Sequence, residues 1–271
     1  MKWRRAKAEP RIERAGAWLY DAHRKRERFA PLPPELAPRD LAEAYAIQGQ
    51  FVGRRAEGLG PVAGYKIALT TPAMRAMVGL DDSIAGDMLQ STIRRGDARV
   101  RAADFQHLLV EFEIAFEMAE DLPAIDAPYS RERIARSVAA AMPALELADD
   151  RHADYAQLRS HALMLAADNG WNEGAVLGAP VRDWRAIDLA ALRGTASING
   201  ERVGEGHGRD VMGHPLDGLV WLANNLASRG LGLWRGDVAI TGSLVTSKFP
   251  KAGDRVRFDA GQLGAVELHV L

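Results

Sequence analysis

The sequence contains no cysteine, and this absence excludes disulfides, thiolate metal sites and a cysteine nucleophile. It also fits a reducing compartment. No run of about 18 uncharged apolar residues occurs, although a membrane helix would need one. The basic start, residues 1–29, lacks the apolar centre of a secretory signal. We therefore expect a soluble, cytoplasmic protein with no membrane partner.

An excess of charge of one sign is also missing, because 35 basic residues balance 36 acidic ones. This balance gives no indication of a polyanion, so we expect no nucleic acid partner. The basic segment RKRER at 24–28 could contact nucleic acid or anionic lipid. It fits better as the solvated face of a helix over 11–28. The apolar positions of that helix are Ile12, Ala15, Leu19 and Ala22.

A second helix is predicted after the proline-rich connector PLPPELAP at 31–38. Asp40 is the expected N-cap of this helix, and Gly58 is its expected end. Both helices precede the part of the chain in which strands are predicted. They therefore indicate a helical amino-terminal cap over residues 1–60.

From residue 61 to residue 271 the pattern changes to short strands separated by glycines. A helix is predicted near 130–142 and another over 213–230, with Pro215 at its first position. Asn199 and Gly200 predict a tight hairpin, because both residues tolerate the positive φ of a type I′ turn. The expected fold class is α+β, a mixed β-sheet with packed helices behind the helical cap.

The run LLVEFEIAFEM at 108–118 contains two glutamates in an otherwise apolar segment. Its apolar residues alternate with a period of two, which predicts a strand with Glu111 and Glu113 on one face. That face could be solvated, as one side of an antiparallel sheet often is. In a sheltered site, two adjacent carboxylates repel, and one would take up a proton unless a cation neutralised them.

A third carboxylate occurs in the apolar run PALELADD at 143–150. Glu146 lies between two leucines, where a charge is costly unless it is paired or solvated. With Glu111 and Glu113 it provides the oxygen ligands that suit a hard cation such as Mg²⁺ or Mn²⁺. Zinc is less favoured, because no HExxH motif occurs and the seven histidines are scattered.

Further candidate residues occur on strands and in turns. Lys66, in AGYKIALTTPAM, could polarise a substrate carbonyl or move a proton, or it could be a surface lysine on a strand edge. Asp168 and Asn169 precede a glycine and could bind substrate, although a turn is the simpler interpretation. In ITGSLV the backbone N–H groups of the segment Thr241, Gly242 and Ser243 could hold a carboxylate, or the segment could be a turn.

The order of several segments resembles that of a known enzyme family. From about residue 40 to the end, the chain is similar to the 2-keto-4-pentenoate hydratase and 4-oxalocrotonate decarboxylase family, within the fumarylacetoacetate hydrolase superfamily. Each segment alone is loose, but their order and spacing together are more specific. The segments are LAEAYAIQ, GYKIALT, VEFEIAFEMAEDLP, PALELADDR, ADN followed by VLG, GHPLDGLVWLANNLASRGLGLWRGD and ITGSL.

This resemblance implies a β-sheet roll of the fumarylacetoacetate hydrolase type, a homo-oligomer and a small 2-oxo or 2-hydroxy acid as substrate. It implies a divalent metal held by Glu111, Glu113 and Glu146, with Lys66 as the active-site lysine. The implied activity is a hydro-lyase that adds water to a 2-hydroxy-2,4-dienoate, a product of aromatic ring cleavage. The product would be a 4-hydroxy-2-oxo acid, formed through a metal-stabilised enolate.

The chain departs from the resembled family at two places. Hydratases commonly carry an acidic pair where this chain has GDMLQST at 86–92, so Asp87 is the remaining candidate for a catalytic acid. After ADN, Trp171 and Glu173 stand where small residues are usual, and they would change the size and charge of the pocket.

Three alternatives follow from the resemblance and the departures. A 2-oxo-3-enedioate decarboxylase would use the same metal and the same enolate. A non-catalytic subunit that binds a metal or a small acid is compatible with both departures. Hydrolytic C–C cleavage is disfavoured, because the residues before the paired glutamates are Leu108, Leu109 and Val110 rather than histidines, and because Glu146 stands where an aspartate is usual.

Overall fold

In the computed structural model, residues 9–271 are described, and residues 1–8 of the expected cap lie outside the described part. The fold is α+β, as the sequence predicts. No helix within residues 9–271 combines the length and the apolar content that crossing a membrane requires. The helices are α1 (Pro10–Arg24), α2 (Leu41–Leu59), α3 (Pro72–Val78), α4 (Arg131–Ser137), α5 (Ala162–Ala167) and α6 (Pro215–Ser228).

The larger sheet contains the central strands of the molecule. Its strand order is β2-β1-β10-β5-β6-β7-β3, with β1 parallel to β10, β7 parallel to β3 and the other neighbours antiparallel. The sheet is therefore mixed, as expected. Its strands are β1 (Val62–Ala68), β2 (Ile84–Leu89), β3 (Ile93–Arg95), β5 (Leu108–Met118), β6 (Val138–Asp149), β7 (Asn172–Leu177) and β10 (Val238–Lys248).

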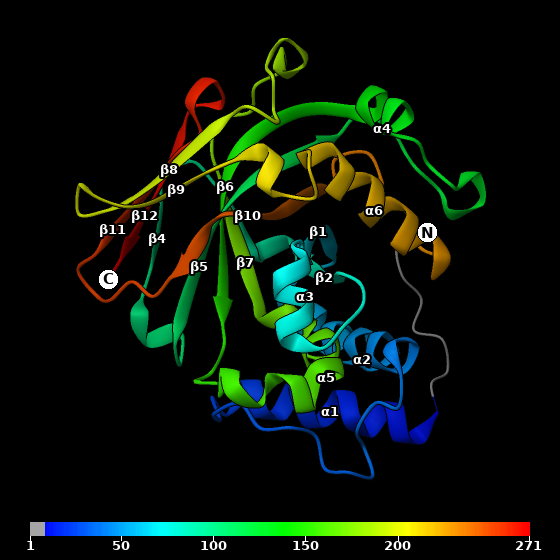
Figure 1. Cartoon of the computed structure of the whole chain (residues 1–271). Helices are drawn as coiled ribbons and strands as arrows, with labels where there is room; N and C mark the ends of the chain where they lie inside the picture. Colours follow the sequence, from blue (N-terminus) through cyan, green and yellow to red (C-terminus); the bar gives the residue numbers. More distant parts are fainter. Residues whose placement is uncertain (1–8) are drawn as a thin grey trace.

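A smaller sheet packs against one side of the larger one, and Figure 1 shows it at the left of the molecule. Its strand order is β4-β12-β11-β8-β9. Phe258 and Val256 of this sheet share one apolar core with Phe112 and Ile114 of the larger sheet and with Leu219 of α6. The strands are β4 (Ala98–Val100), β8 (Arg193–Ile198), β9 (Glu201–His207), β11 (Arg255–Asp259) and β12 (Ala265–Val270).

The larger sheet curls, so that strands from distant places in its order meet. Met88 on the edge strand β2 belongs to one buried cluster with Ala175 and Leu177 on β7. Such a contact between strands far apart in the sheet requires the sheet to bend around that cluster. Many side chains inside the curl are small, Ala115 and Ala144 among them, which leaves room at one end for polar groups.

The amino-terminal helices form the expected cap. α1 packs on α2, and Figure 1 shows both helices with α5 at the lower end of the molecule. Asp40 caps α2, because its side chain accepts a hydrogen bond of 2.8 Å from the backbone N–H of Glu43. The division at residue 60 falls after α2, but α2 also contacts α5, since Gln48 donates to the carbonyl of Ala166 at 2.9 Å. The domain boundary therefore stays a prediction.

Two further local predictions are confirmed. Asn199 and Gly200 have φ values of 54° and 86° and join β8 to β9 in the predicted hairpin. Pro215 begins α6.

Two predicted helix ends are wrong. The first helix ends at Arg24 and not at residue 28, because Arg26 has a φ of 55° and leaves the helix. The helix expected over 130–142 ends at Ser137, and the alanine-rich residues that follow enter β6 instead. Pairing with β5 along the whole of β6 outweighs the helical propensity of those alanines.

Candidate metal centre and active site

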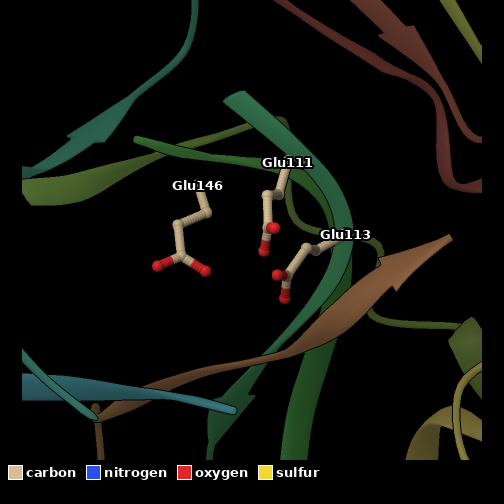
Figure 2. A group of neighbouring side chains, drawn as sticks. All are labelled: Glu111, Glu113 and Glu146. Carbon is tan, nitrogen blue, oxygen red and sulfur yellow. The ribbon is translucent and has the colours of Figure 1, made fainter. Parts of the chain in front are cut away.

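The strand register brings the expected metal ligands together inside the curl. Glu111 of β5 lies directly opposite Glu146 of β6. Glu113 follows Glu111 by two residues, so it points to the same face of the sheet. Figure 2 shows the side chains of Glu111 and Glu113 on one strand and that of Glu146 facing them. Each glutamate offers a carboxylate oxygen, and these oxygens lie within 4.8 Å of one another.

Each carboxylate is fixed by a donor from another element. Glu113 Oε2 accepts a hydrogen bond of 2.6 Å from the backbone N–H of Gly242. Asn172 Nδ2 donates to Glu146 Oε1 at 2.8 Å. Ser247 Oγ donates to Glu111 Oε1 at 2.8 Å. These contacts orient the carboxylates before any cation binds.

Two buried oxygens in this cluster have no partner. Glu113 Oε1 and Glu146 Oε2 are fully enclosed, and neither has a hydrogen-bond partner among residues 9–271. An unpaired buried carboxylate oxygen is strongly unfavourable. A divalent cation bound between the glutamates would satisfy both oxygens, so the residues present fit the hard cation that the sequence predicts.

The electrostatics point in the same direction. Burial, together with the charges of Glu146 and Glu111, raises the pKa of Glu113 well above its ordinary value. Burial also raises the pKa of Glu146, although the neighbouring Lys66 opposes this. Three carboxylates are therefore held where ionisation is costly without positive charge.

Lys66 belongs to the same cluster. It lies on β1, is 2% exposed, and its Nζ is 3.1 Å from Glu146 Oε1. Burial alone would lower the pKa of Lys66, but the charges of Glu146, Glu111 and Glu113 outweigh burial and raise it. The lysine therefore faces the glutamates, which excludes the interpretation as a surface lysine on a strand edge.

Gly242 bends β10 toward the glutamates. Its φ is 111°, and the pairing of β10 with β5 shifts register between Ile240 and Ser243. A Cβ at Gly242 would lie 2.5 Å from Thr70 Cγ2, so only glycine fits this close approach. The bulge directs the N–H of Gly242 at Glu113 instead of at a strand neighbour.

A cavity of about 410 Å³ leads from this cluster to the surface. Lys66, Glu111, Gly242 and Ser243 line its inner end. Trp171 also lines it, which agrees with the expected effect of this residue on pocket size. A cavity of this size with polar groups at one end is typical of a small-molecule site.

Several predicted site residues lie away from the cavity. Asp87 pairs across the sheet with Tyr65, one residue from Lys66, so its side chain points to the opposite face. Burial raises the pKa of Asp87 to about 6. Thr241 is fully buried, and its hydroxyl donates to the carbonyl of Ile114 at 3.1 Å.

Asp168 and Asn169 hold the loop beside the lysine. Asp168 is fully buried and forms ion pairs with His23 of α1, at 2.6 Å, and with Arg151. The side-chain amide of Asn169 bonds both the N–H and the carbonyl of Asp87, at 2.7 and 2.9 Å. Neither residue lines the cavity. Their contact with substrate stays a prediction.

Glu173 is directed toward the cap. It pairs with Arg55 of α2 and lies 3.3 Å from His23. Burial opposes ionisation, but Arg55 and His23 outweigh it and lower the pKa of Glu173 to about 2. Glu173 stands where the resembled family usually has a small residue, and its negative charge is thus neutralised outside the cavity.

Three further residues of the site were not predicted from the sequence: Asn172, Ser247 and Gly170. Asn172 donates a hydrogen bond to Glu146, and Ser247 donates one to Glu111. A Cβ at Gly170 would lie 3.1 Å from Lys66 Nζ. Asn169, Gly170 and Trp171 all have positive φ, of 57°, 55° and 62°. A bulky residue such as Trp171 rarely adopts a positive φ. Nothing in the neighbouring sequence predicts that it does so here.

Comparison with known proteins places this site in context. A family model described as fumarylacetoacetate (FAA) hydrolase C-terminal matches residues 78–271. The 2-keto-4-pentenoate hydratase 1 of Dechloromonas aromatica (strain RCB) is 34% identical over 94% of this chain and 95% of that protein. The 4-oxalocrotonate decarboxylase of Pseudomonas putida is 27% identical over 94% of this chain and 92% of its own length.

The fold has a close counterpart among solved structures. The 4-oxalocrotonate decarboxylase from Pseudomonas putida G7, complexed with magnesium and adipate, superposes with a TM-score of 0.88. It covers 99% of this chain and 100% of that one, at 23% sequence identity. At this identity the match shows that the two chains share the fold.

Proposed function

Because the chain belongs to the fumarylacetoacetate hydrolase family, among the relatives of 2-keto-4-pentenoate hydratases and 4-oxalocrotonate decarboxylase, we propose that it is a metal-dependent hydro-lyase. Its substrate is a 2-hydroxy-2,4-dienoate of the 2-oxo-4-pentenoate type, and its product is a 4-hydroxy-2-oxo acid. The proposal includes Mg²⁺ or Mn²⁺ as the cofactor, a cytoplasmic location and a homo-oligomeric state.

One observation carries the proposal. Glu113 Oε1 and Glu146 Oε2 are buried and have no hydrogen-bond partner in the described part of the chain, at the inner end of a cavity that Glu111 and Lys66 line. Glu111, Glu113 and Glu146 would hold the cation, with Asn172 and Ser247 fixing two of the carboxylates. A bound divalent cation would supply Lewis-acid stabilisation of negative charge on the substrate's 2-oxygen.

The chain's own residues have distinct roles. The ammonium group of Lys66 lies at the inner end of the cavity, where it orients the substrate oxygens and moves the proton that C5 of the dienol receives. Gly242 and Ser243 line the cavity beside Glu111 and contact the substrate carboxylate. Water then adds at C4. Asp168 and Asn169 hold the loop that carries Gly170 and thereby position it against Lys66.

Decarboxylation of a 2-oxo-3-enedioate is the second candidate, since the 4-oxalocrotonate decarboxylase of Pseudomonas putida matches nearly the whole chain. Both reactions place negative charge on the same 2-oxygen. They differ in product, because only the decarboxylase releases carbon dioxide.

The test is the loss of dienoate absorbance with 2-hydroxypenta-2,4-dienoate, measured with Mg²⁺, with Mn²⁺ and with a chelator. The product is identified by mass. Metal-dependent formation of the hydrated product supports the hydro-lyase. A folded, metal-loaded protein that turns over no dienoate contradicts it, and release of carbon dioxide from 4-oxalocrotonate would then identify the decarboxylase. Metal binding with neither reaction would identify a non-catalytic subunit.

A further inference from the structure

The cavity continues well beyond the metal centre, and most of the residues that line it there are apolar, although Thr70, Thr71 and Thr246 also belong to the lining. At the mouth lie Met74 and Met77 of α3 and Tyr155, which are 38%, 49% and 41% exposed. Arg159 Nη1 donates to the carbonyl of Ala76 at 3.1 Å, so the segment after Tyr155 is tied to α3 at this point. The cavity is therefore a channel with a polar inner end and an opening between these two segments.

The wall between the two ends consists of buried apolar side chains. They come from different elements and are at most 7% exposed. A wall of this kind gains free energy by removing apolar ligand surface from water. Its one polar side-chain atom is Trp171 Nε1, which is buried and has no hydrogen-bond partner among the described residues. The residues are Leu69, Val78, Leu109, Leu158, Leu165 and Trp171.

Positive charge is restricted to the inner end. Among the described residues that line the cavity, Lys66 is the only cation, and it already pairs with Glu146. Asp210 adds a negative charge to the lining. Two guanidinium groups lie nearby but are not part of the lining: Arg75 donates to the carbonyl of Leu69 at 3.2 Å, and Arg159 donates to that of Ala76 at 3.1 Å. A second carboxylate in the outer part would lose its hydration without gaining a counter-charge.

The volume also exceeds what a five-carbon acid requires. A cavity of about 410 Å³ lies in the range in which much larger ligands bind. Methionines at the mouth adapt to ligands of different shape, because their side chains are unbranched and polarizable.

We infer that this site takes monocarboxylate 2-hydroxydienoates whose C5 carries an apolar chain or ring, and that it discriminates against dicarboxylates. The inference rests on the proposed function, since it places the 2-oxo acid end of the ligand at the metal centre. The apolar substituent then lies along the buried wall and reaches the methionines of α3. The same discrimination disfavours a substrate of the 4-oxalocrotonate type.

Binding of saturated 2-oxo acids tests this without catalysis. The affinities of 2-oxopentanoate, 2-oxohexanoate, 2-oxooctanoate and 2-oxoadipate are measured by calorimetry in the presence of Mg²⁺. Each added methylene is expected to increase affinity about fourfold, equivalent to about 0.8 kcal/mol. 2-Oxooctanoate should thus bind roughly sixtyfold more tightly than 2-oxopentanoate. 2-Oxoadipate should bind at least about tenfold more weakly than 2-oxohexanoate.

A charge at the mouth should reverse the preference. Met77→Lys places an ammonium group where the far end of the ligand lies, and it should fold because this residue is 49% exposed. It is expected to raise the affinity for 2-oxoadipate about tenfold and to lower that for 2-oxooctanoate. Met77→Leu controls for the change of shape. Ile125→Lys controls for added charge, because Ile125 is 87% exposed and does not line the cavity.

The outcomes separate this inference from the proposed function. Affinity that rises with chain length supports the inference even if no dienoate is hydrated. Affinity that does not change with length, 2-oxoadipate binding as well as 2-oxohexanoate, or no binding of any 2-oxo acid would overturn it. If 2-hydroxypenta-2,4-dienoate is hydrated in that case, the proposed function stands and the inference alone fails.

Discussion

His23 and Asp168 form an ion pair between the helical cap and the loop beside Lys66, with His23 Nε2 2.6 Å from Asp168 Oδ1. Arg151 pairs with the other oxygen of Asp168. The ring of His23 also lies 3.3 Å from Glu173. The cap therefore fixes both ends of the segment that contains Gly170, the residue against Lys66.

His23→Gln should give a stability difference that depends on pH. Burial lowers the pKa of His23, but Asp168 and Glu173 outweigh burial and raise it above 6.5. A raised histidine pKa contributes stability that is complete below pH 6.5 and is lost as the pH rises through the folded value. The carboxylates are ionised above about pH 4.5, so the full effect falls between about pH 4.5 and 6.5.

Urea unfolding of both proteins across this range is the measurement. We expect wild type to be more stable by about 1.5–3 kcal/mol between these pH values, and by less at higher pH. His269→Gln is the control, because His269 lies on the partly exposed strand β12 and forms a much longer pair, with its Nε2 3.9 Å from Glu267 Oε2. A difference that is constant from pH 5 to pH 9 would contradict the assignment of a charged His23.

Glu113→Gln should remove metal affinity without unfolding the protein. Wild type should gain about 2.7 kcal/mol of stability when Mg²⁺ is present at a hundredfold excess over its dissociation constant. The variant should bind Mg²⁺ at least tenfold more weakly, because it loses a charged ligand. Without metal it should be at least as stable as wild type, since the neutral amide relieves the repulsion among the glutamates.

Thermal unfolding with and without Mg²⁺ measures both effects. Glu117→Gln is the matched control, because Glu117 lies on the same strand and face but pairs with Arg95 at 2.7 Å. Equal stabilisation of both variants by Mg²⁺ would exclude Glu113 as a ligand.

Gly170→Ala should lower turnover, whereas Gly96→Ala should not. Both glycines have positive φ, of 55° and 74°, so alanine costs about 1–2 kcal/mol at either position. Only at Gly170 would the new Cβ meet Lys66 Nζ, at 3.1 Å, since nothing lies within 4 Å of a Cβ at Gly96. We expect at least a tenfold loss of dienoate turnover for Gly170→Ala. Similar turnover in both variants, measured at saturating metal, would show that the contact with Lys66 is unimportant.

Asp87→Asn tests whether the remaining acid of the segment 86–92 is catalytic. Its side chain points away from Lys66, so turnover should stay within about threefold of wild type. A carboxyl pKa raised from 3.8 to about 6 makes the folded protein less stable as the pH rises above 3.8, and the effect is complete above about pH 6. The variant should therefore be about 3 kcal/mol more stable at pH 7, and equally stable below pH 3.8. A large loss of turnover in a folded variant would restore Asp87 as a catalytic residue.

Local signals in the sequence predict the elements that depend on neighbouring residues. The cap at Asp40, the hairpin at Asn199 and the start of α6 at Pro215 all follow from short-range rules. The end of α4 does not, because the alanines after Ser137 become a strand only through pairing with β5. Long-range pairing of this kind has no local signature.

The candidate site divides in the same way. Alternation on β5 predicts that Glu111 and Glu113 share a face, but only the register of two strands places Glu146 opposite Glu111. One ion-pair partner of Asp168 is His23, 145 residues earlier in the chain, so the sequence around Asp168 indicates only a turn and not this pairing. Asn172 was missed for the same reason, since its partner Glu146 lies on another strand.

The position of β10 between β1 and β5 determines when the centre can assemble during synthesis. During synthesis, Lys66, Glu111 and Glu146 leave the ribosome well before residues 238–248 do. Until residues 238–248 have emerged, no strand can pair with both β1 and β5. We therefore expect the glutamates to stay in contact with water until β10 is in place. Insertion of β10 brings Gly242 to Glu113 and encloses the carboxylates late, so the repulsion among them opposes the last stage of folding rather than the first.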